Sequence, residues 1–312
     1  MIKRLKILHI GNVAGVASTL ANEQKKMNHK VTVMAFNRHC LLFKSDHDNY
    51  VLDNFPLNIM RNISLILKLF PRHDILHFHA RSILPFYLDL PLWKLFGKII
   101  IIHYHGSDIR NKKNSCIVNR YADNIFVSTP DLLEWVPDAI WVPNPKATEG
   151  YSAPDVSNEQ KTDSIIIAHA PTNRDVKGTQ YIVDAVDHLR QEGLKIELRV
   201  LEGLPHDQVI REFSKADIII DQLLLGWYGV VTIEGMSLKK PVCVYIRDDL
   251  TRFIPKDALI NCNPETIYAV LKTIINNKNL LNNVAATGYK YVCQYHNVEG
   301  ITKNIIARYI MN

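Results

Sequence analysis

Short apolar runs alternate with longer amphipathic runs along the chain, and the alternation occurs in two successive blocks. The first block predicts strands at 6–10, 30–35, 74–78 and 99–103, helices at 17–27, 57–70 and 84–96, and shorter elements at 117–122 and 125–128. The second predicts strands at 164–169, 195–200 and 218–220, and helices at 179–191, at 207–216, from Val230, at 264–276 and at 280–296. Strands that alternate with helices require crossover connections, so we expect an α/β protein with two parallel sheets.

A proline-rich segment at 141–157, WVPNPKATEGYSAPDVS, separates the two blocks and predicts a linker. We therefore expect one domain at 1–145 and a second at 146–296. The last segment spaces Ile301, Ile305, Ile306 and Tyr309 on one helical face. Such a face needs a packing partner, so we expect residues 297–312 to form a helix that crosses back to the first domain.

Length and composition agree with two globular domains, because the chain has 312 residues and 47% of them are hydrophobic. The five cysteines are scattered and form no CxxC pair, which argues against a disulfide framework or a zinc site: Cys40, Cys116, Cys243, Cys262 and Cys293. We expect a reducing, cytoplasmic environment. The start of the chain, MIKRLKILHIGN, is too briefly apolar for a signal peptide and is interpreted as the first strand.

Charge is uneven between the two halves. Residues 1–150 hold 19 Lys and Arg against 12 Asp and Glu, whereas residues 151–312 hold 18 against 19. The excess could draw the first half to an anionic membrane surface or an anionic acceptor, or it could be dispersed solubilising charge. The apolar run 83–104 contains Asp89, Pro91 and Lys94, so we interpret it as a helix and a strand rather than a membrane span.

The run 216–244 is the most informative, because it predicts a strand, a glycine-containing turn and a helix that begins near Val230 and carries Glu234 in its first turn or so. Backbone N–H groups at a helix start attract anions, and a nearby carboxylate can accept hydrogen bonds from sugar hydroxyls. This combination predicts a nucleotide-sugar pocket. The alternative is an ordinary turn with Glu234 on the surface, complementing the helix dipole.

Other loops after strands narrow the function. The turn after the first strand, GNVAG at 11–15, lacks GxGxxG spacing, and no acidic residue follows the second strand, which argues against a dehydrogenase. Its small residues would still let a phosphate or sugar approach the backbone. The loop HYHGSD follows the fourth strand, where His105 could donate to a sugar hydroxyl and Asp108 could orient it.

Arg174 and Lys177 lie in the turn between a strand and a helix, where two cations could clamp a diphosphate. Two possible metal sites are weaker hypotheses than this diphosphate clamp. His77, His79 and His103 could be ligands but have no nearby carboxylate or cysteine. A DxD sequence at 46–48 has no preceding apolar strand, so we expect no metal.

Taken in order, the motifs HYHGSD, VPNP at 142–145, NRDVKGT, ADIIIDQ, GWYGVVTIEGMSLKKPV and YKYVCQYHNVEG resemble the family 4 retaining group of GT-B glycosyltransferases. The resemblance implies the GT-B fold, in which two Rossmann-like, doubly wound parallel-sheet domains face a central cleft. The first domain would then take the acceptor and the second the nucleotide-sugar donor.

The resemblance also implies roles for individual residues. Arg174 and Lys177 would bind the donor diphosphate, Glu234 the ribose, and His105 would lie near the donor sugar. The loop from Gly11 to Gly15 would approach the donor phosphates.

Two departures from the family pattern concern the donor sugar. The first glutamate of the family's E-x7-E motif falls on Gly226, and the spacing from Arg174 to Lys177 is shorter than usual. We expect the missing contact to come from one or more of the neighbouring groups: Asp221, Gln222, and backbone N–H groups near Tyr228, Gly229 and Val230.

The expected function is retaining transfer of a hexose from a UDP- or GDP-linked donor to a saccharide or lipid-linked acceptor, without a metal or other cofactor. The setting implied is cell-surface polysaccharide or glycolipid assembly at the inner face of the membrane, where the apolar helix 57–70 could rest on lipid or pack in the core. A non-catalytic sugar-nucleotide-binding subunit and a sugar-nucleotide epimerase of the same fold are the alternatives. Nothing suggests a nucleic-acid partner.

Overall fold

The computed structural model describes residues 4–35, 46–48, 55–80, 82–84, 87–110, 118–146 and 163–311. The chain divides into two compact units. The first consists of Met1–Pro145 with Val298–Asn312, and the second of Lys146–Asn297. Most of the predicted linker, together with Cys40 and Cys116, lies outside the described residues.

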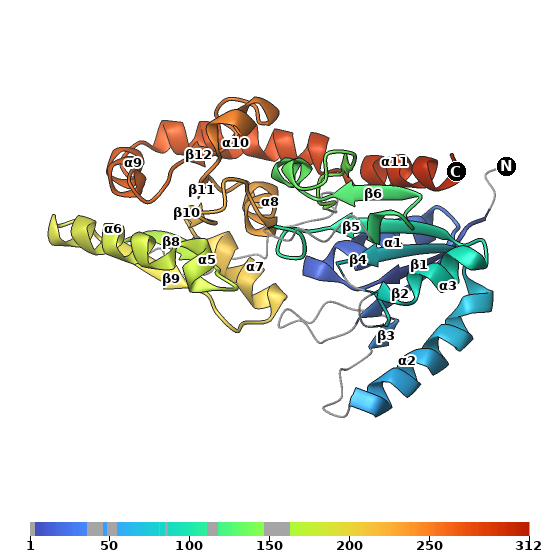
Figure 1. Cartoon of the computed structure of the whole chain (residues 1–312). Helices are drawn as coiled ribbons and strands as arrows, with labels where there is room; N and C mark the ends of the chain where they lie inside the picture. Colours follow the sequence, from blue (N-terminus) through green and yellow to red (C-terminus); the bar gives the residue numbers. More distant parts are fainter. Residues whose placement is uncertain are drawn as a thin grey trace. The chain divides into compact units, whose positions relative to one another are not determined.

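The first unit contains a seven-stranded, all-parallel sheet in the order β3-β2-β1-β4-β5-β6-β7 (Figure 1). Its strands are β1 (Lys6–Ile10), β2 (Lys30–Ala35), β3 (His47–Asp48), β4 (Ile75–His79), β5 (Ile99–Tyr104), β6 (Asn124–Val127) and β7 (Ile140–Trp141). Its helices are α1 (Val16–Lys26), α2 (Phe55–Leu69), α3 (Leu90–Leu95) and α11 (Val298–Ile310), with 3-10 turns at Val13–Gly15, Phe70–Arg72 and Pro130–Glu134.

Alternation along the strands of this sheet builds two separate cores. Leu8 and Ile10 face α2 and α3, whereas Ile7, one residue before Leu8, faces α1 and α11. Side chains of a strand point to opposite faces with a period of two, so one residue step changes the core to which a side chain belongs. This alternation decides where the histidines of the first unit lie.

The second unit contains a five-stranded, all-parallel sheet in the order β12-β11-β10-β8-β9 (Figure 1). Its strands are β8 (Ile165–His169), β9 (Ile196–Val200), β10 (Ile218–Ile220), β11 (Val242–Val244) and β12 (Ile260–Asn261). Its helices are α5 (Arg174–Lys177), α6 (Thr179–Gln191), α7 (His206–Lys215), α8 (Val230–Ser237), α9 (Ile267–Ile274) and α10 (Lys278–Tyr295), with a 3-10 turn at Asp248–Phe253. Both units are therefore Rossmann-like α/β domains, as the sequence predicts.

Most predicted elements are present with shifted ends, and the largest difference is at 84–96. The helix there begins only at Leu90, with Pro91 in its first turn. A proline disfavours helical geometry at the preceding residue and is tolerated only at a helix start, so the helix is confined to Leu90–Leu95. Within the described ranges, no helix is both long and apolar enough to cross a membrane.

Candidate functional site

The carboxyl edge of the second sheet brings Lys177 and Asp221 together. Asp221 follows β10 directly, and Lys177 ends α5, which follows the neighbouring strand β8. The Lys177 ammonium donates to Oδ1 of Asp221 at 2.7 Å, and Oδ2 accepts from the Gly229 N–H at 2.7 Å and the Thr232 hydroxyl at 2.9 Å. Burial alone would raise the pKa of the Asp221 carboxyl, but Lys177 and these donors outweigh it, so its pKa lies below the usual value.

The start of α8 lies directly against this ion pair. A Cβ on Gly229 would lie 3.2 Å from the Asp221 carboxylate and 3.3 Å from the Lys177 ammonium. Gly229 is the N-cap of α8, and the first N–H groups of a helix lack intrahelical acceptors. Lys177 is 13% exposed and uses one of its three N–H donors on Asp221. The edge therefore offers a cation and helical N–H groups to an anion.

Arg174 pairs with a different carboxylate from Lys177. Its guanidinium makes a bidentate pair with Glu202, which follows β9, at 2.6 to 3.1 Å. This pair is exposed, with 61% and 38% of the two side chains accessible. Because α5 is only one turn long, its two cations pair with different carboxylates, and the diphosphate clamp stays a prediction.

Glu234 lies in the second turn of α8 and is buried, so the alternative of a surface residue in the first turn is wrong. Its Oε1 accepts from the Lys146 ammonium at 3.0 Å and hydrogen-bonds Nε2 of His206 at 2.6 Å. Burial raises the pKa of the Glu234 carboxyl, but Lys146 and His206 outweigh it, so the net shift is downward. Two cationic or polar partners hold this buried carboxylate in one position, where it acts as a hydrogen-bond acceptor.

The turn between β10 and α8 is organised by Gln222, which is fully buried. Its amide nitrogen donates to the carbonyls of Trp227 and Tyr245, and its Oε1 accepts from the N–H groups of Leu224 and Leu225. These four hydrogen bonds use its donors and both lone pairs. Gln222 shapes the loop and has no hydrogen-bonding capacity left for a donor sugar, which contradicts that part of the prediction.

Gly226, just before this turn's aromatic pair, has a backbone that favours glycine. Its φ is +75°, and a Cβ there would lie 2.8 Å from Cγ of Arg247. Trp227 and Tyr228 next to it are buried and stacked at 4.6 Å. The Tyr228 hydroxyl hydrogen-bonds Tyr291 and His296, so this side chain anchors the loop. The backbone of Gly226 and the contacts of Tyr228 therefore fix the conformation of this loop. The Gly229 N–H already donates to the Asp221 carboxylate.

In the first unit, Gly11 is required by packing. Its φ is +91°, and a Cβ would lie 2.5 Å from the His79 carbonyl oxygen. Gly15 is the left-handed N-cap of α1, with a φ of +75°. The close approach at Gly11 is to strand β4 of the same unit, which accounts for the glycine without a ligand.

His105 lies just beyond β5 and is half-buried, with both ring nitrogens hydrogen-bonded. Its Nδ1 is 2.6 Å from the Ser128 hydroxyl and its Nε2 is 2.9 Å from Nδ1 of His79. Burial lowers the pKa of His105 to about 4, although Asp108 opposes the shift. Asp108 accepts from the backbone N–H groups of His105 and Gly106, so the expectation that it orients the ring is wrong.

The predicted histidine trio is part of a larger cluster. Among the described residues, two sets of three histidines bring one ring nitrogen each within 4.8 Å of one another: His9, His77 and His79, and His79, His103 and His105. In the DxD sequence, the Asp46 carboxylate accepts from the Val33 N–H at 2.8 Å and pairs with Lys25 at 3.3 Å. The side chains of His47 and Asp48 lie outside the described residues.

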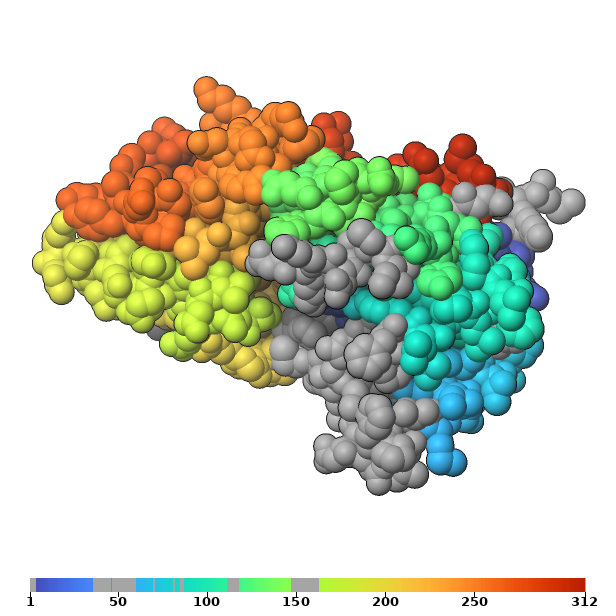
Figure 2. Space-filling model, in the orientation of Figure 1, coloured from blue at the N-terminus to red at the C-terminus, as the bar shows by residue number. Residues whose placement is uncertain are grey.

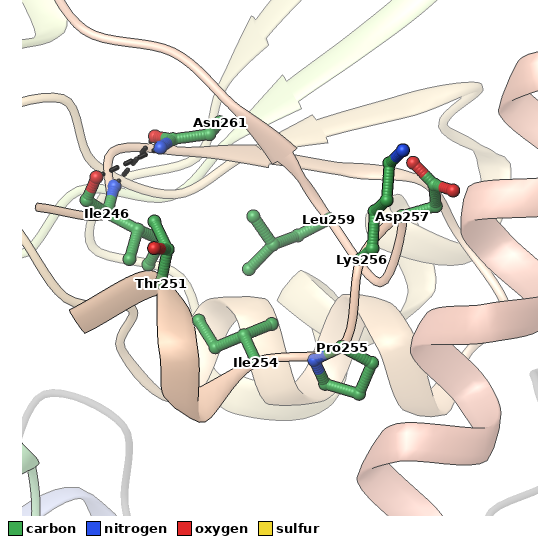
Figure 3. A pocket seen from close by; sticks show the side chains of 8 residues that line it. All are labelled: Ile246, Thr251, Ile254, Pro255, Lys256, Asp257, Leu259 and Asn261. Carbon is green, nitrogen blue, oxygen red and sulfur yellow. Dashed lines mark hydrogen bonds between the residues drawn. The ribbon is translucent and has the colours of Figure 1, made fainter. Parts of the chain in front are cut away.

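A separate cavity of about 270 Å³ lies in the second unit, beside the ends of β11 and β12. Figure 3 shows the residues that line it: Ile246, Thr251, Ile254, Pro255, Lys256, Asp257, Leu259 and Asn261. The Asn261 side chain bridges to both backbone groups of Ile246. None of the predicted site residues lines this cavity.

Sequence reasoning missed His9, Ser128, Lys146 and His206 as partners of the predicted site residues. His9 and Ser128 could have been found from the sequence. Each ends a strand segment in which every second residue is apolar, so each is expected on the same face of the sheet as His77. Lys146 and His206 carry no such signal. Their contact with Glu234 depends on how the chain enters the second unit and on where α7 begins.

No family model and no curated protein matches the sequence. Solved structures do match its fold over nearly their full lengths. HepE of Anabaena, solved with UDP-glucose, has a TM-score of 0.72 at 13% identity, over 97% of this chain and 99% of that one. Sucrose-phosphate synthase of Thermosynechococcus elongatus has a TM-score of 0.72 at 14% identity, over 99% of both chains. UDP-GlcNAc 2-epimerase of Neisseria meningitidis, bound to UDP-GlcNAc, has 0.64 at 15%, over 99% and 100%. The chain therefore has the GT-B fold, shared by glycosyltransferases and these epimerases.

Proposed function

We propose that the chain is a retaining, metal-independent glycosyltransferase that moves a hexose from a UDP- or GDP-linked donor to a hydroxyl of a saccharide or lipid-linked acceptor. The observation that carries the proposal is the anion site formed by Lys177, Asp221 and the start of α8. The ligands bound to the structural neighbours support a nucleotide sugar as the ligand class.

In the proposed reaction, the bond between the sugar C1 and the diphosphate oxygen breaks, and its electron pair stays on the diphosphate. The acceptor hydroxyl forms the new bond to C1 on the same face and gives its proton to the leaving phosphate oxygen. Lys177 and the N–H groups of α8 would stabilise the negative charge that grows on the leaving group. Asp221 holds the Lys177 ammonium in place by accepting its hydrogen bond.

Other residues would bind the rest of the donor. Glu234 would bind the ribose through Oε2 while Oε1 keeps Lys146 and His206. His105 and the turn from Gly11 to Gly15 would lie near the sugar and phosphates. Arg174 would bind the diphosphate only after its ion pair with Glu202 breaks. Both members of that pair are exposed, so the pair is weak.

A ligand screen followed by a transfer assay tests the proposal. UDP-, GDP-, ADP- and dTDP-sugars are compared by thermal shift, because a ligand that binds the folded state raises the midpoint. Lys177→Ala should abolish both the shift and transfer, whereas Lys195→Ala, at a 72% exposed lysine of the same unit, should change neither. Circular dichroism verifies that both variants are folded. Near-normal turnover by Lys177→Ala would overturn the assignment.

The epimerase neighbours make sugar-nucleotide epimerisation the second candidate. Incubation of the identified donor without any acceptor separates the two, because only an epimerase converts the sugar and leaves the nucleotide attached. Donor binding with neither product would instead indicate a non-catalytic sugar-nucleotide-binding subunit. Proton NMR of the sugar's anomeric region distinguishes these results.

The proposed setting is polysaccharide or glycolipid assembly on an anionic membrane. Helix α2 buries Ile66 and Leu69 but exposes Met60, Ile63 and Leu67, which share one face. Helix α3 exposes Leu92 and Leu95, and its C-cap residue Phe96 is exposed as well. Exposed basic residues accompany both helices: Lys68, Arg72 and Lys94. Figure 2 shows the light-blue surface of α2 beside the turquoise surface of α3. Apolar side chains flanked by cations suit the interface of an anionic lipid surface.

Vesicle sedimentation tests this setting. The protein should sediment with vesicles that contain anionic lipid and remain in solution with neutral ones. Leu67→Ser combined with Leu95→Ser should release it, whereas Leu224→Ser, at an exposed leucine of the second unit, should not. Equal sedimentation of all three proteins would refute the membrane assignment.

A further inference from the structure

Eight buried or half-buried side chains of the first unit form a closed ring of hydrogen bonds. The links are Gln24–His9 at 2.8 Å, His9–His79 at 2.9 Å, His79–His105 at 2.9 Å, His105–Ser128 at 2.6 Å, Ser128–His103 at 3.1 Å, His103–His77 at 3.2 Å, His77–Tyr309 at 2.6 Å and Tyr309–Gln24 at 3.5 Å. Every ring nitrogen of the five histidines takes part in one link. We call these residues the histidine ring.

The fold explains why these residues meet. The histidines and Ser128 occupy alternate positions at the carboxyl ends of β1, β4, β5 and β6, on the face that carries Ile7, Ile101 and Phe126. Helices α1 and α11 cover this face and supply Gln24 and Tyr309. Parallel strands end at one edge, so the polar ends of four strands converge beneath two helices.

Counting donors shows that the ring is complete when every member is neutral. A neutral imidazole has one N–H donor and one acceptor nitrogen, and a hydroxyl or a side-chain amide can supply one of each. Eight members therefore supply eight donors for eight links, and all links must run in the same direction. With Oε1 of Gln24 accepting from His9, this direction puts the proton on Nε2 of all five histidines. Rotation of the Gln24 amide would reverse every link and put the proton on Nδ1.

An added proton cannot be accommodated without breaking a link, because an imidazolium has two donors and no acceptor. Nine donors for eight links would leave two donors facing each other. Burial lowers the pKa of His9 to about 4, although its hydrogen bond with Gln24 opposes the shift. Burial and the neighbouring histidines together hold the pKa values of His77, His79 and His103 well below the usual value. The ring is therefore a neutral unit.

We propose that Gln24 and Tyr309 are positioning residues for His105, because by closing the ring they fix which His105 nitrogen carries the proton. Neither residue contacts His105; each acts through the direction of the intervening hydrogen bonds. The value of this to a reaction rests on the proposed role of His105 beside the donor sugar. The coupling itself is a property of the free protein and can be measured without substrate.

Long-range ¹H–¹⁵N NMR on protein labelled with ¹⁵N-histidine reports the tautomer of each imidazole. In the wild-type protein we expect His9, His77, His79, His103 and His105 to share one tautomer. Tyr309→Phe removes two links and frees the Gln24 amide to rotate, so His105 should become a mixture of both tautomers. Gln24→Met also opens the ring, because it removes the links of Gln24 to His9 and Tyr309, so we expect the same mixture at His105. Tyr104→Phe is the matched control, since Tyr104 lies on the opposite face of β5 and hydrogen-bonds Asn119.

Three results would overturn the proposal. The first is a mixture of tautomers among the five histidines of the wild-type protein. The second is an unchanged His105 tautomer in both ring-opening variants. The third is stoichiometric Zn²⁺ uptake with shifts of these imidazole nitrogens, which would make the cluster a metal site. If the tautomers behave as expected and no sugar transfer is found, the ring stands while the proposed function fails.

Discussion

Both units bury polar side chains at the carboxyl ends of their strands, but the histidine ring of the first does so without charge, whereas Asp221 and Glu234 of the second are buried in ion pairs. The histidine ring satisfies eight neutral side chains by hydrogen bonds alone. The second unit buries Asp221 with Lys177 and Glu234 with Lys146 and His206. Neutral groups need only partners, whereas buried charges need opposite charges as well. The two edges therefore respond differently to pH, to mutation and to an incoming anion.

This difference suits the two halves of the proposed reaction. A neutral histidine ring could contact sugar hydroxyls at short range without itself attracting ions. A charged edge with a cation that has unused N–H donors attracts the diphosphate, which carries most of the donor's binding charge. On this proposal, the same architecture would provide two kinds of site through different residues at the strand ends.

The largest expected difference between the two units is in how their stability responds to acid. Among the described residues, seven histidines of the first unit have lowered pKa values: His9, His29, His73, His77, His79, His103 and His105. In the second unit, burial lowers the pKa of His169. Below pH 6.5 the unfolded chain binds protons that the folded first unit excludes, so its stability should fall as pH drops from 6.5 toward 4. The shifts of His9 and His105 to about 4 are worth roughly 3 kcal/mol each.

Hydrogen exchange measured at a series of pH values, corrected for the intrinsic rate at each, reports the two units separately. Peptides of the first unit should lose protection at a higher pH than peptides of the second. Simultaneous loss in both units would show that the neutral edge is no more sensitive to acid than the charged one.

Removing one partner from each edge should give the next largest difference. Asp221→Ala leaves the Lys177 ammonium largely buried without its carboxylate, and we expect a loss of about 3 to 5 kcal/mol. Ser128→Ala leaves two neutral imidazole nitrogens without a partner and should cost about 1 to 3 kcal/mol. Urea unfolding measures both, and an equal or reversed order would contradict the distinction between charged and neutral burial.

Gly226→Ala tests whether the loop beside the charged edge has a conformation of its own. A φ of +75° should cost about 1 to 2 kcal/mol for any residue with a Cβ, and the contact with Arg247 adds to it. Adding Arg247→Ala relieves the contact and leaves the backbone cost. Urea unfolding of the single and double variants separates the two contributions, and an unchanged midpoint in both would mean that the loop adopts another backbone.

Arg174→Ala should have the smallest effect on stability, because both members of its pair with Glu202 are exposed and such pairs contribute little. We expect no measurable shift of the unfolding midpoint. Donor affinity, measured by titration calorimetry, decides its role. Weaker binding would show that Arg174 leaves Glu202 for the diphosphate, and unchanged binding would leave Lys177 as the cation of the site.

Strand and helix positions followed from local periodicity, because each element must bury one face. The helix at 84–96 was too long because Pro91 limits where a helix can start. Of the predicted residues of the second unit, Lys177, Asp221 and Gly229 meet at one sheet edge, since strand ends converge there. Their partners were not predictable, because the contact of Arg174 with Glu202 depends on the strand order β8-β9 and that of His77 with Tyr309 on the placement of α11.

The second unit is one continuous segment, and its two ends pair with each other through Lys146 and Asn297. The first unit, by contrast, needs residues from both ends of the chain, because α11 supplies Tyr309 and part of the core. Domains generally fold as units while a protein is being synthesised, beginning at the N-terminus. Here that order is inverted: the second unit has all its residues before the first one does. The histidine ring therefore cannot close until the last residues of the chain have been made, because Tyr309 and part of the cover over this face of the sheet come from α11.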